Sequence, residues 1–174
     1  MNSKWLIIFF AIALSACSSN PSKYDELSEQ EYYQQAQSSL DKNSFMIAID
    51  RLKLLESRYP FGSYAEQAQL EMMYAHFMLS DYDRVLALSE RFIRLHPLHE
   101  QADYAYYLRA LATYEMGFGL VGRYFEHDVA RRDPTPLQDA FYYFSELLTR
   151  YPDSPYTADA HARMIYIKER LASH

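Results

Sequence analysis

The chain has 174 residues, of which 49% are hydrophobic and 23% are charged. This length corresponds to one domain, and the composition supports a packed core rather than a disordered chain. The formal net charge of −6 gives no electrostatic reason to bind nucleic acid, and a single cysteine excludes an internal disulfide or a cysteine-based metal site. With only 4 glycines and 7 prolines, a loop-rich all-β fold is disfavoured.

The N-terminal segment has the pattern of a sorting signal. Lys4 precedes an almost unbroken apolar run, WLIIFFAIAL, from Trp5 to Leu14. The run is shorter than the ~20 residues that a membrane-spanning helix needs, and it fits the apolar region of a signal peptide. The sequence therefore predicts a signal peptide over residues 1–16.

The motif Leu14-Ser15-Ala16-Cys17 resembles a bacterial lipobox. The resemblance implies cleavage before Cys17, a diacylglycerol thioether on its sulfur and an acyl chain such as palmitate on the new α-amine. Two or more acyl chains hold a protein firmly at a membrane, whereas one binds only marginally. Ser18 follows rather than an acidic residue, which implies, by resemblance to Gram-negative lipoprotein sorting, the periplasmic face of the outer membrane. The alternative is a secreted protein with a free thiol.

A repeated helix pattern fills residues 28–174, after a polar segment at 17–27 that we expect to tether the lipid to the domain. Pro60, Pro97 and Pro152 each end a segment of periodic apolar residues. Apolar or small residues recur fifteen, twelve, eleven and five positions before each proline, and this spacing places them on one face of an α-helix. A small residue that lets two helices approach closely recurs eight positions after each proline: Ala68, Ala105 and Ala160.

The pattern predicts three helix pairs and a final unpaired helix. The start signals are two capping boxes and two prolines at first helical positions: Ser28-x-x-Glu31, Ser63-x-x-Glu66, Thr135-Pro136 and Ser154-Pro155. Three of the 4 glycines lie in residues 117–134, which we expect to be an insertion within the third pair. The predicted helices are 28–42 with 44–59, 63–79 with 81–96, 99–116 with 135–151, and 154–172.

Such pairs, each closed by a proline, resemble the tetratricopeptide repeat. Ala36, Ala48 and Pro60 occupy the small, small and proline positions of that motif, but Met73 and Val85 stand where alanine is usual in the second repeat. The resemblance implies an all-α fold, a right-handed α-solenoid of three pairs plus a half repeat, whose first helices line a concave groove. A plain helical bundle is the alternative. Many of the 17 tyrosines fall on these helices, and a groove lined with tyrosine can hold an extended peptide.

Motifs for catalysis or metal binding are weak. The chain has no phosphate-cradling glycine loop and no GxSxG. His96 and His99 are the best metal candidates, but Pro97 lies between them, so they do not share a helical face. We therefore expect no enzyme activity, no metal and no cofactor beyond the lipid on Cys17. The candidate acid–base residues lie in the predicted insertion and at a helix start, where polar residues are expected anyway: His127, Asp128 and Asp139.

Several strings, taken in order and together with the lipobox, resemble the BamD family, also called YfiO or ComL. The resemblance runs from about Cys17 to the end of the chain. The strings are RYPFGSY at 58–64, RFIRLHP at 91–97, DYAYYLRAL at 103–111, RDP at 132–134 and YPDSPY at 151–156.

This resemblance implies a lipid-anchored periplasmic scaffold of the outer-membrane β-barrel assembly (BAM) complex. The implied partners are BamA, the other lipoproteins of the complex and unfolded barrel precursors, whose folding and membrane insertion the scaffold would aid. A tetratricopeptide lipoprotein that organises cell-wall enzymes is the alternative, and a histidine-dependent periplasmic hydrolase is a more distant one. The family places precursor recognition near the RYPFG turn, which here means Tyr59, Phe61, Gly62 and Tyr64.

The end of the chain departs from the family pattern. Family members continue for further repeats and carry most of their BamA-docking surface there, whereas the helix predicted at 154–172 has no second helix. We expect either that the chain is a fragment or that a partner covers the apolar side of this helix. That side is formed by Met164, Ile165, Ile167 and Leu171.

Overall fold

The computed structural model of the chain describes residues 27–122 and 134–172, with side chains up to residue 117 in the first range. Its described part contains α-helices and no strand, which confirms the all-α prediction. The predicted signal peptide, the lipobox with Cys17, most of the tether and residues 123–133 of the predicted insertion lie outside these ranges. The helices are α2 (Glu29–Asp41), α3 (Phe45–Arg58), α4 (Ala65–Met78), α5 (Tyr82–Leu95), α6 (Ala102–Gly122), α7 (Thr135–Arg150) and α8 (Thr157–Ala172).

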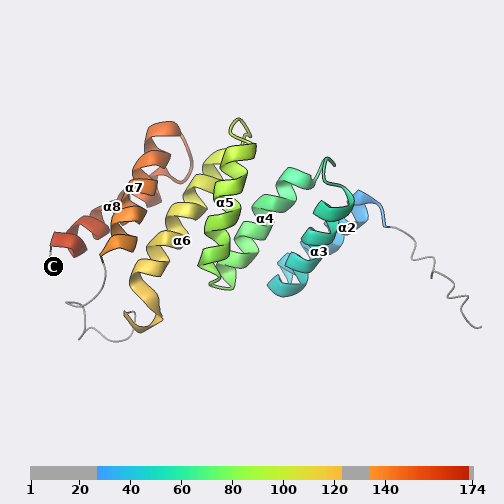
Figure 1. Cartoon of the computed structure of the whole chain (residues 1–174), viewed down its shortest axis with the longest axis horizontal. Helices are drawn as coiled ribbons and strands as arrows, with labels where there is room; N and C mark the ends of the chain where they lie inside the picture. Colours follow the sequence, from blue (N-terminus) through green and yellow to red (C-terminus); the bar gives the residue numbers. More distant parts are fainter. Residues whose placement is uncertain (1–26, 123–133, 173–174) are drawn as a thin grey trace, which may run out of the picture.

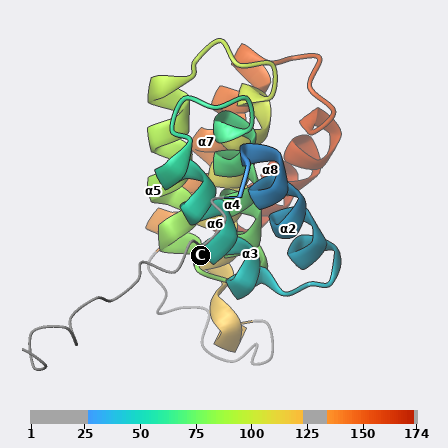
Figure 2. The ribbon, with the colours of Figure 1, turned by 90° about the vertical axis from the view of Figure 1, so that its right-hand side faces the viewer.

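Consecutive helices pack against one another along the whole array. Figure 1 shows them standing side by side from α2 at one end to α8 at the other. Seen along the long axis, α5 lies on one side of the array and α2 and α8 lie on the other (Figure 2). This arrangement is consistent with a tetratricopeptide-like solenoid. Within the two described ranges, no helix combines the length and the hydropathy needed to span a membrane.

The core follows the register set by the three prolines. Side chains twelve and five positions before each proline have no exposed surface: Ala48, Val85, Ala140, Leu55, Phe92 and Leu147. The small residues eight positions after each proline are equally buried where the helices cross: Ala68, Ala105 and Ala160. Each helix pair buries one face against the next pair, so the core is continuous along the array.

Two of the four predicted helix starts are confirmed. Ser28 and Glu31 form a capping box, in which the Ser28 N–H donates to Glu31 Oε2 at 2.8 Å and the Glu31 N–H donates to Ser28 Oγ at 3.3 Å. Pro136 lies in the first turn of α7. Backbone N–H groups in a first turn have no acceptor within the helix, so the N–H that proline lacks costs no hydrogen bond there.

The other two predicted starts are wrong. The helix α4 begins at Ala65, after Tyr64, and no side chain caps it. The helix α8 begins at Thr157, beyond Pro155. In both places the chain first makes hydrogen-bonded turns after the proline, which delay the helix: Gly62 N–H to the Tyr59 carbonyl at 3.0 Å, and Ser154 N–H to the Tyr151 carbonyl at 3.1 Å.

Helix boundaries otherwise agree with the predictions to within a few residues, except at α6. This helix continues to Gly122, whereas the predicted helix ends at residue 116. Gly117, which the sequence places in the predicted insertion, lies where α6 packs against α7. A Cβ atom at Gly117 would stand 2.6 Å from Leu137 Cδ2, so glycine here permits a close approach of two helices and does not mark a loop.

A buried histidine closes the turn between α4 and α5. The His76 side chain is almost fully buried, and its Nδ1 lies 3.0 Å from Asp81 Oδ2. Burial lowers the pKa of His76 below its usual 6.5, and the hydrogen bond to Asp81 opposes this shift only in part. The folded protein therefore favours the neutral imidazole.

We expect the free energy of unfolding to decrease as the pH falls below about 6.5. The unfolded chain then binds a proton on His76 more tightly than the folded protein does, and one such group contributes at most about 1.4 kcal/mol per pH unit. Denaturant unfolding between about pH 7.5 and 5.5 measures this slope. His76→Asn should flatten it, whereas replacement of the exposed His161 by Asn should not. Equal slopes in the parent and His76→Asn would contradict the assignment.

Candidate functional site

The RYPFG turn joins α3 to α4 and presents one aromatic side chain to solvent. Phe61 is 100% exposed. Tyr59 is half-buried, because its hydroxyl donates to the Leu27 carbonyl at 2.9 Å and its ring lies 6.3 Å from the Tyr32 ring. Of the four predicted recognition residues, Phe61 alone is fully available for contact.

The other two recognition residues, Gly62 and Tyr64, hold α2 against this turn. The Tyr64 ring stacks on Tyr33 of α2, with centroids 4.3 Å apart and planes 16° apart. The Tyr64 N–H donates to Glu29 Oε1 at 2.7 Å. The same carboxylate passes directly over Gly62, where a Cβ atom would overlap it. Gly62 and Tyr64 therefore position the turn, and Phe61 extends from it.

Gly62→Ala should displace the Glu29 carboxylate and destabilise the protein by about 1 kcal/mol, because a close contact must open. Chemical denaturation measures the loss. Glu29→Ala provides the control: once the carboxylate is absent, adding Gly62→Ala should cost much less than it does alone. Additive losses in the double variant would show that the two residues do not interact.

A pocket of about 780 Å³ lies next to Phe61, between α3, α4 and α5. Two of its charged lining residues pair with each other: Arg91 contacts Glu56 at 3.0 Å. The two candidate metal ligands flank one carboxylate, with His96 Nδ1 at 3.1 Å and His99 Nε2 at 3.4 Å from Glu66. Both imidazole rings also pack on Phe92.

The Gln101 N–H donates to His99 Nδ1 at 3.1 Å, which assigns the ring proton to Nε2, facing Glu66. Within residues 27–122 and 134–172, no group of three or more metal-ligating side chains is arranged to hold an ion. The cluster of Glu66, His96 and His99 therefore links the loop after α5 to α4.

The candidate acid–base residues are not brought together in the described part of the chain. Asp139 is exposed on α7, and His127 and Asp128 fall outside the described residues. The lipobox residues and Cys17 are outside as well.

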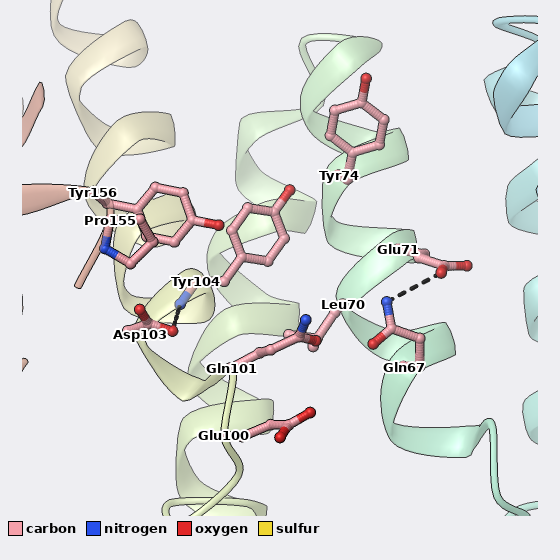
Figure 3. A pocket seen from close by; sticks show the side chains of 10 residues that line it. All are labelled: Gln67, Leu70, Glu71, Tyr74, Glu100, Gln101, Asp103, Tyr104, Pro155 and Tyr156. Atoms are coloured by element: carbon pink, nitrogen blue, oxygen red, sulfur yellow. Dashed lines mark hydrogen bonds between the residues drawn. The ribbon is translucent and has the colours of Figure 1, made fainter.

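A second pocket, of about 530 Å³, lies among α4, α6 and the loop before α8 (Figure 3). Three tyrosines reach it: Tyr74, Tyr104 and Tyr156. Beyond it, Tyr107 stacks on Tyr156 with centroids 4.5 Å apart. Burial raises the pKa of Tyr107 to about 12, helped by its hydrogen bond to Asp159, so its hydroxyl stays protonated at neutral pH. The many tyrosines in the sequence predicted such a groove. No motif in the sequence indicated the carboxylates that line the same pocket.

The helix pairs, the tyrosine-lined pocket and the exposed aromatic turn define a tetratricopeptide-like binding scaffold. Residues 25–174 match the YfiO family, described as outer membrane lipoprotein. The chain therefore belongs to the YfiO family of outer membrane lipoproteins, as its sequence strings indicated.

Several relatives carry the name outer membrane protein assembly factor BamD. The chain is 41% identical over 161 residues to the one from Vibrio cholerae, covering 92% of this chain and 67% of that protein. It is 34% identical to the one from Neisseria gonorrhoeae over 97% of this chain and 66% of that protein. The Pasteurella multocida protein is 35% identical over 100% of this chain and 66% of its own length. The chain thus spans about two thirds of these relatives.

Proposed function

We propose that the chain is a binding scaffold in the assembly of outer-membrane β-barrel proteins. In this role it holds unfolded barrel precursors and docks on BamA and the other lipoproteins of the BAM complex, at the periplasmic face of the outer membrane. The relatives named as BamD support the assembly role, and membership of the lipoprotein family supports a lipid on Cys17. The structural observation that carries the proposal is the fully exposed Phe61 on its braced turn.

The geometry of the turn suits capture of an unfolded chain. An aromatic ring in water is available to any apolar segment, and fixing it in advance reduces the entropy lost on binding. The Tyr59 bond to Leu27 and the Tyr64 bond to Glu29 supply that fixation. The adjacent pocket gives a neighbouring side chain of the precursor a place to bind. Aromatic anchors beside pockets commonly dominate the binding energy of protein interfaces.

This role requires binding and no chemical step. The histidine candidates His96 and His99 contact Glu66 and pack on Phe92, which supports a structural role for them. We propose that the protein is not an enzyme and needs no cofactor besides its covalent lipid.

Site-specific crosslinking tests the assembly role. A photo-crosslinking amino acid placed at Phe61 in the lipidated full chain, in cells exporting barrel proteins, should trap barrel precursors. The same residue at Leu98, which is 96% exposed in the loop after α5, is the matched control and should trap far less. Phe61→Ser should lower the recovery of precursors several-fold. In a separate experiment, BamA should co-purify with the parent chain from detergent-solubilised membranes. Crosslinks to peptidoglycan hydrolases instead would favour a scaffold for cell-wall enzymes and overturn the proposal.

The anchor has its own test. Cys17→Ala should abolish labelling by a fatty-acid analogue and release the protein from membranes, because no acyl chain is then attached. Ser18→Ala is the control and should keep both the label and the membrane fraction. A Cys17→Ala protein that stays membrane-bound would contradict the lipid assignment.

A further inference from the structure

The pocket among α4, α6 and the loop before α8 is lined by acidic side chains. Three of its lining side chains are carboxylic acids, Glu71, Glu100 and Asp103, and none of the described lining residues is basic. Its floor includes Leu70, which is almost fully buried. Figure 3 shows Tyr156 and Tyr104 at the left and centre and Tyr74 above them. Glu71 lies at the right on α4, and Glu100 lies below, in the loop before α6.

Asp103 already has its hydrogen bonds. Its Oδ2 accepts from the Ser154 hydroxyl at 2.6 Å, and its Oδ1 accepts from the Tyr104 N–H at 2.8 Å. These bonds fix the loop before α8 to the first turn of α6. Asp103 therefore has a structural role and is not the main attraction for a ligand.

Glu71 is different, because only one of its two oxygens is used. Its Oε1 accepts from the Tyr33 hydroxyl at 2.6 Å and from Gln67 Nε2 at 3.1 Å. Its Oε2 is buried from solvent and has no hydrogen-bond partner among the described residues. A buried carboxylate oxygen without a partner keeps its charge uncompensated, so Glu71 attracts a cation bound in the adjoining pocket.

The tyrosines add a second attraction for positive charge. The faces of aromatic rings carry negative partial charge and bind ammonium and guanidinium groups. Tyr104 and Tyr156 lie with centroids 5.5 Å apart, and Tyr74 faces them from α4. Burial raises the pKa of Tyr104 above its usual range, so the phenol adds no negative charge of its own at neutral pH.

Elsewhere in this protein, the same combination of groups holds an arginine. On α8, the Arg163 guanidinium lies 4.8 Å from the Tyr114 centroid while its Nε contacts Asp159 at 2.6 Å. On α6, Arg109 lies 4.2 Å from the Tyr143 centroid and contacts Glu146 at 2.6 Å. The pocket has carboxylates and tyrosines, but none of the described side chains that line it is a cation.

We propose that this pocket binds the cationic side chain, lysine or arginine, of an extended polypeptide segment lying along the groove. The charged head lies with Glu71 and Glu100, and the aliphatic stem lies against Leu70 and the tyrosine rings. This deepens the proposed scaffold function, because it names a feature of the polypeptides that the scaffold holds. It adds a charge preference to the aromatic contact expected at Phe61, on a different part of the molecule.

A set of matched peptides tests the charge preference. The probes are fluorescein-labelled, end-capped peptides of sequence Thr-Val-Thr-Lys-Thr-Val-Thr, with arginine, norleucine or glutamate in place of the lysine. Their binding to the detergent-solubilised lipidated full chain is measured by fluorescence anisotropy. The lysine and arginine probes should bind about tenfold more tightly than the norleucine probe, and added salt should reduce this difference.

Two variants assign the binding to this pocket. Glu100→Gln, in the exposed loop before α6, should weaken the lysine probe about three- to tenfold and leave the norleucine probe unchanged. Glu71→Gln should do the same while keeping an acceptor for Tyr33. Glu90→Gln, at an exposed site on α5, is the matched control and should change nothing.

Equal affinity for the lysine and norleucine probes would overturn the inference, as would a lysine preference that survives both pocket variants. Either result is distinguishable from failure of the scaffold function, because precursor crosslinking at Phe61 does not depend on this pocket. If crosslinks form and the charge preference is absent, only the inference fails. If the charge preference is present and no precursor is trapped, the inferred cation binding by the pocket is supported and the assembly role is contradicted.

Discussion

Replacing Ala68 by tryptophan is expected to destabilise the protein by about 3 kcal/mol, measured as the free energy of unfolding in denaturant. Ala68 has no exposed surface, and it lies in a cluster with Ala36, Leu52, Leu55 and Met72 where α2, α3 and α4 meet. An indole in that space must push the helices apart, because protein interiors are close-packed and contain few voids. Loss of this contact should also loosen α2, which braces the Phe61 turn.

Tryptophan at Met78 on the same helix provides the control, because that side chain is 45% exposed and has room for a larger group. This variant should unfold close to the parent. If Ala68→Trp kept the parent melting temperature, Ala68 would have to face solvent. The repeat register derived from the prolines would then be wrong.

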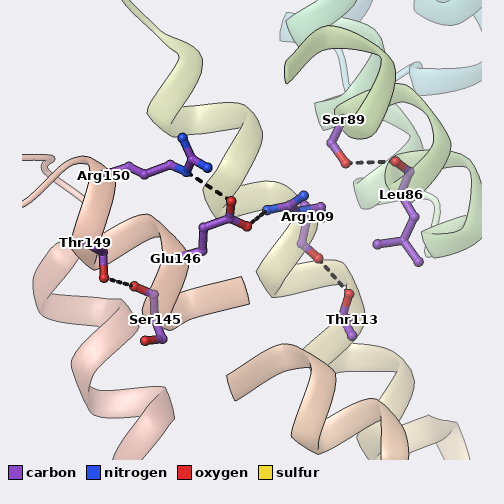
Figure 4. Close-up of polar contacts among 8 residues, drawn as sticks. All are labelled: Leu86, Ser89, Arg109, Thr113, Ser145, Glu146, Thr149 and Arg150. Carbon is purple, nitrogen blue, oxygen red and sulfur yellow. Dashed lines mark hydrogen bonds and ion pairs between the residues drawn. The ribbon is translucent and has the colours of Figure 1, made fainter. Parts of the chain in front are cut away.

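Arg109→Ala is expected to cost about 3 kcal/mol, because it leaves part of a buried ion pair uncompensated. Arg109 is 8% exposed and its guanidinium contacts Glu146 of α7 at 2.6 Å (Figure 4). The same group lies 5.0 Å from the Tyr106 centroid and 4.2 Å from the Tyr143 centroid, so the substitution also removes packing. The loss should appear in thermal and denaturant unfolding.

Arg150 is the matched control, because it contacts the other oxygen of the same carboxylate at 3.0 Å from an exposed position. Water screens an exposed pair, so Arg150→Ala should lower stability little or not at all. If the two variants lost equal stability, burial would not be the reason that Arg109 matters. The pair would then be a surface interaction despite its position between α6 and α7.

The repeat register could be read from the sequence because the same helix pair recurs. Each copy must bury the same face against its neighbour, so apolar positions keep a constant distance from each proline. The exposed Phe61 follows from the same logic, since it lies in a turn just after Pro60. The family strings then indicated the family to which this repeat protein belongs.

Local start signals were less reliable than the repeat. The capping box at Ser28 formed, whereas the same pattern at Ser63 did not, because Glu66 pairs instead with His96 and His99 in the segment after α5. Gly117 looked like part of a loop and is instead a helix contact with Leu137. In both cases a contact from a distant part of the chain outweighed a local preference.

The sequence by itself determined the helical class, the pairs, the buried faces and the family, because periodicity and repetition are properties of the chain order. Only the tertiary structure decided which of the recognition residues is free and which brace it. It also showed that Glu71 of α4, which has one unpaired oxygen, lines the same pocket as tyrosines from α6 and from the loop before α8. These facts depend on distances between residues far apart in the sequence. Packing fixes those distances, and no local pattern encodes them.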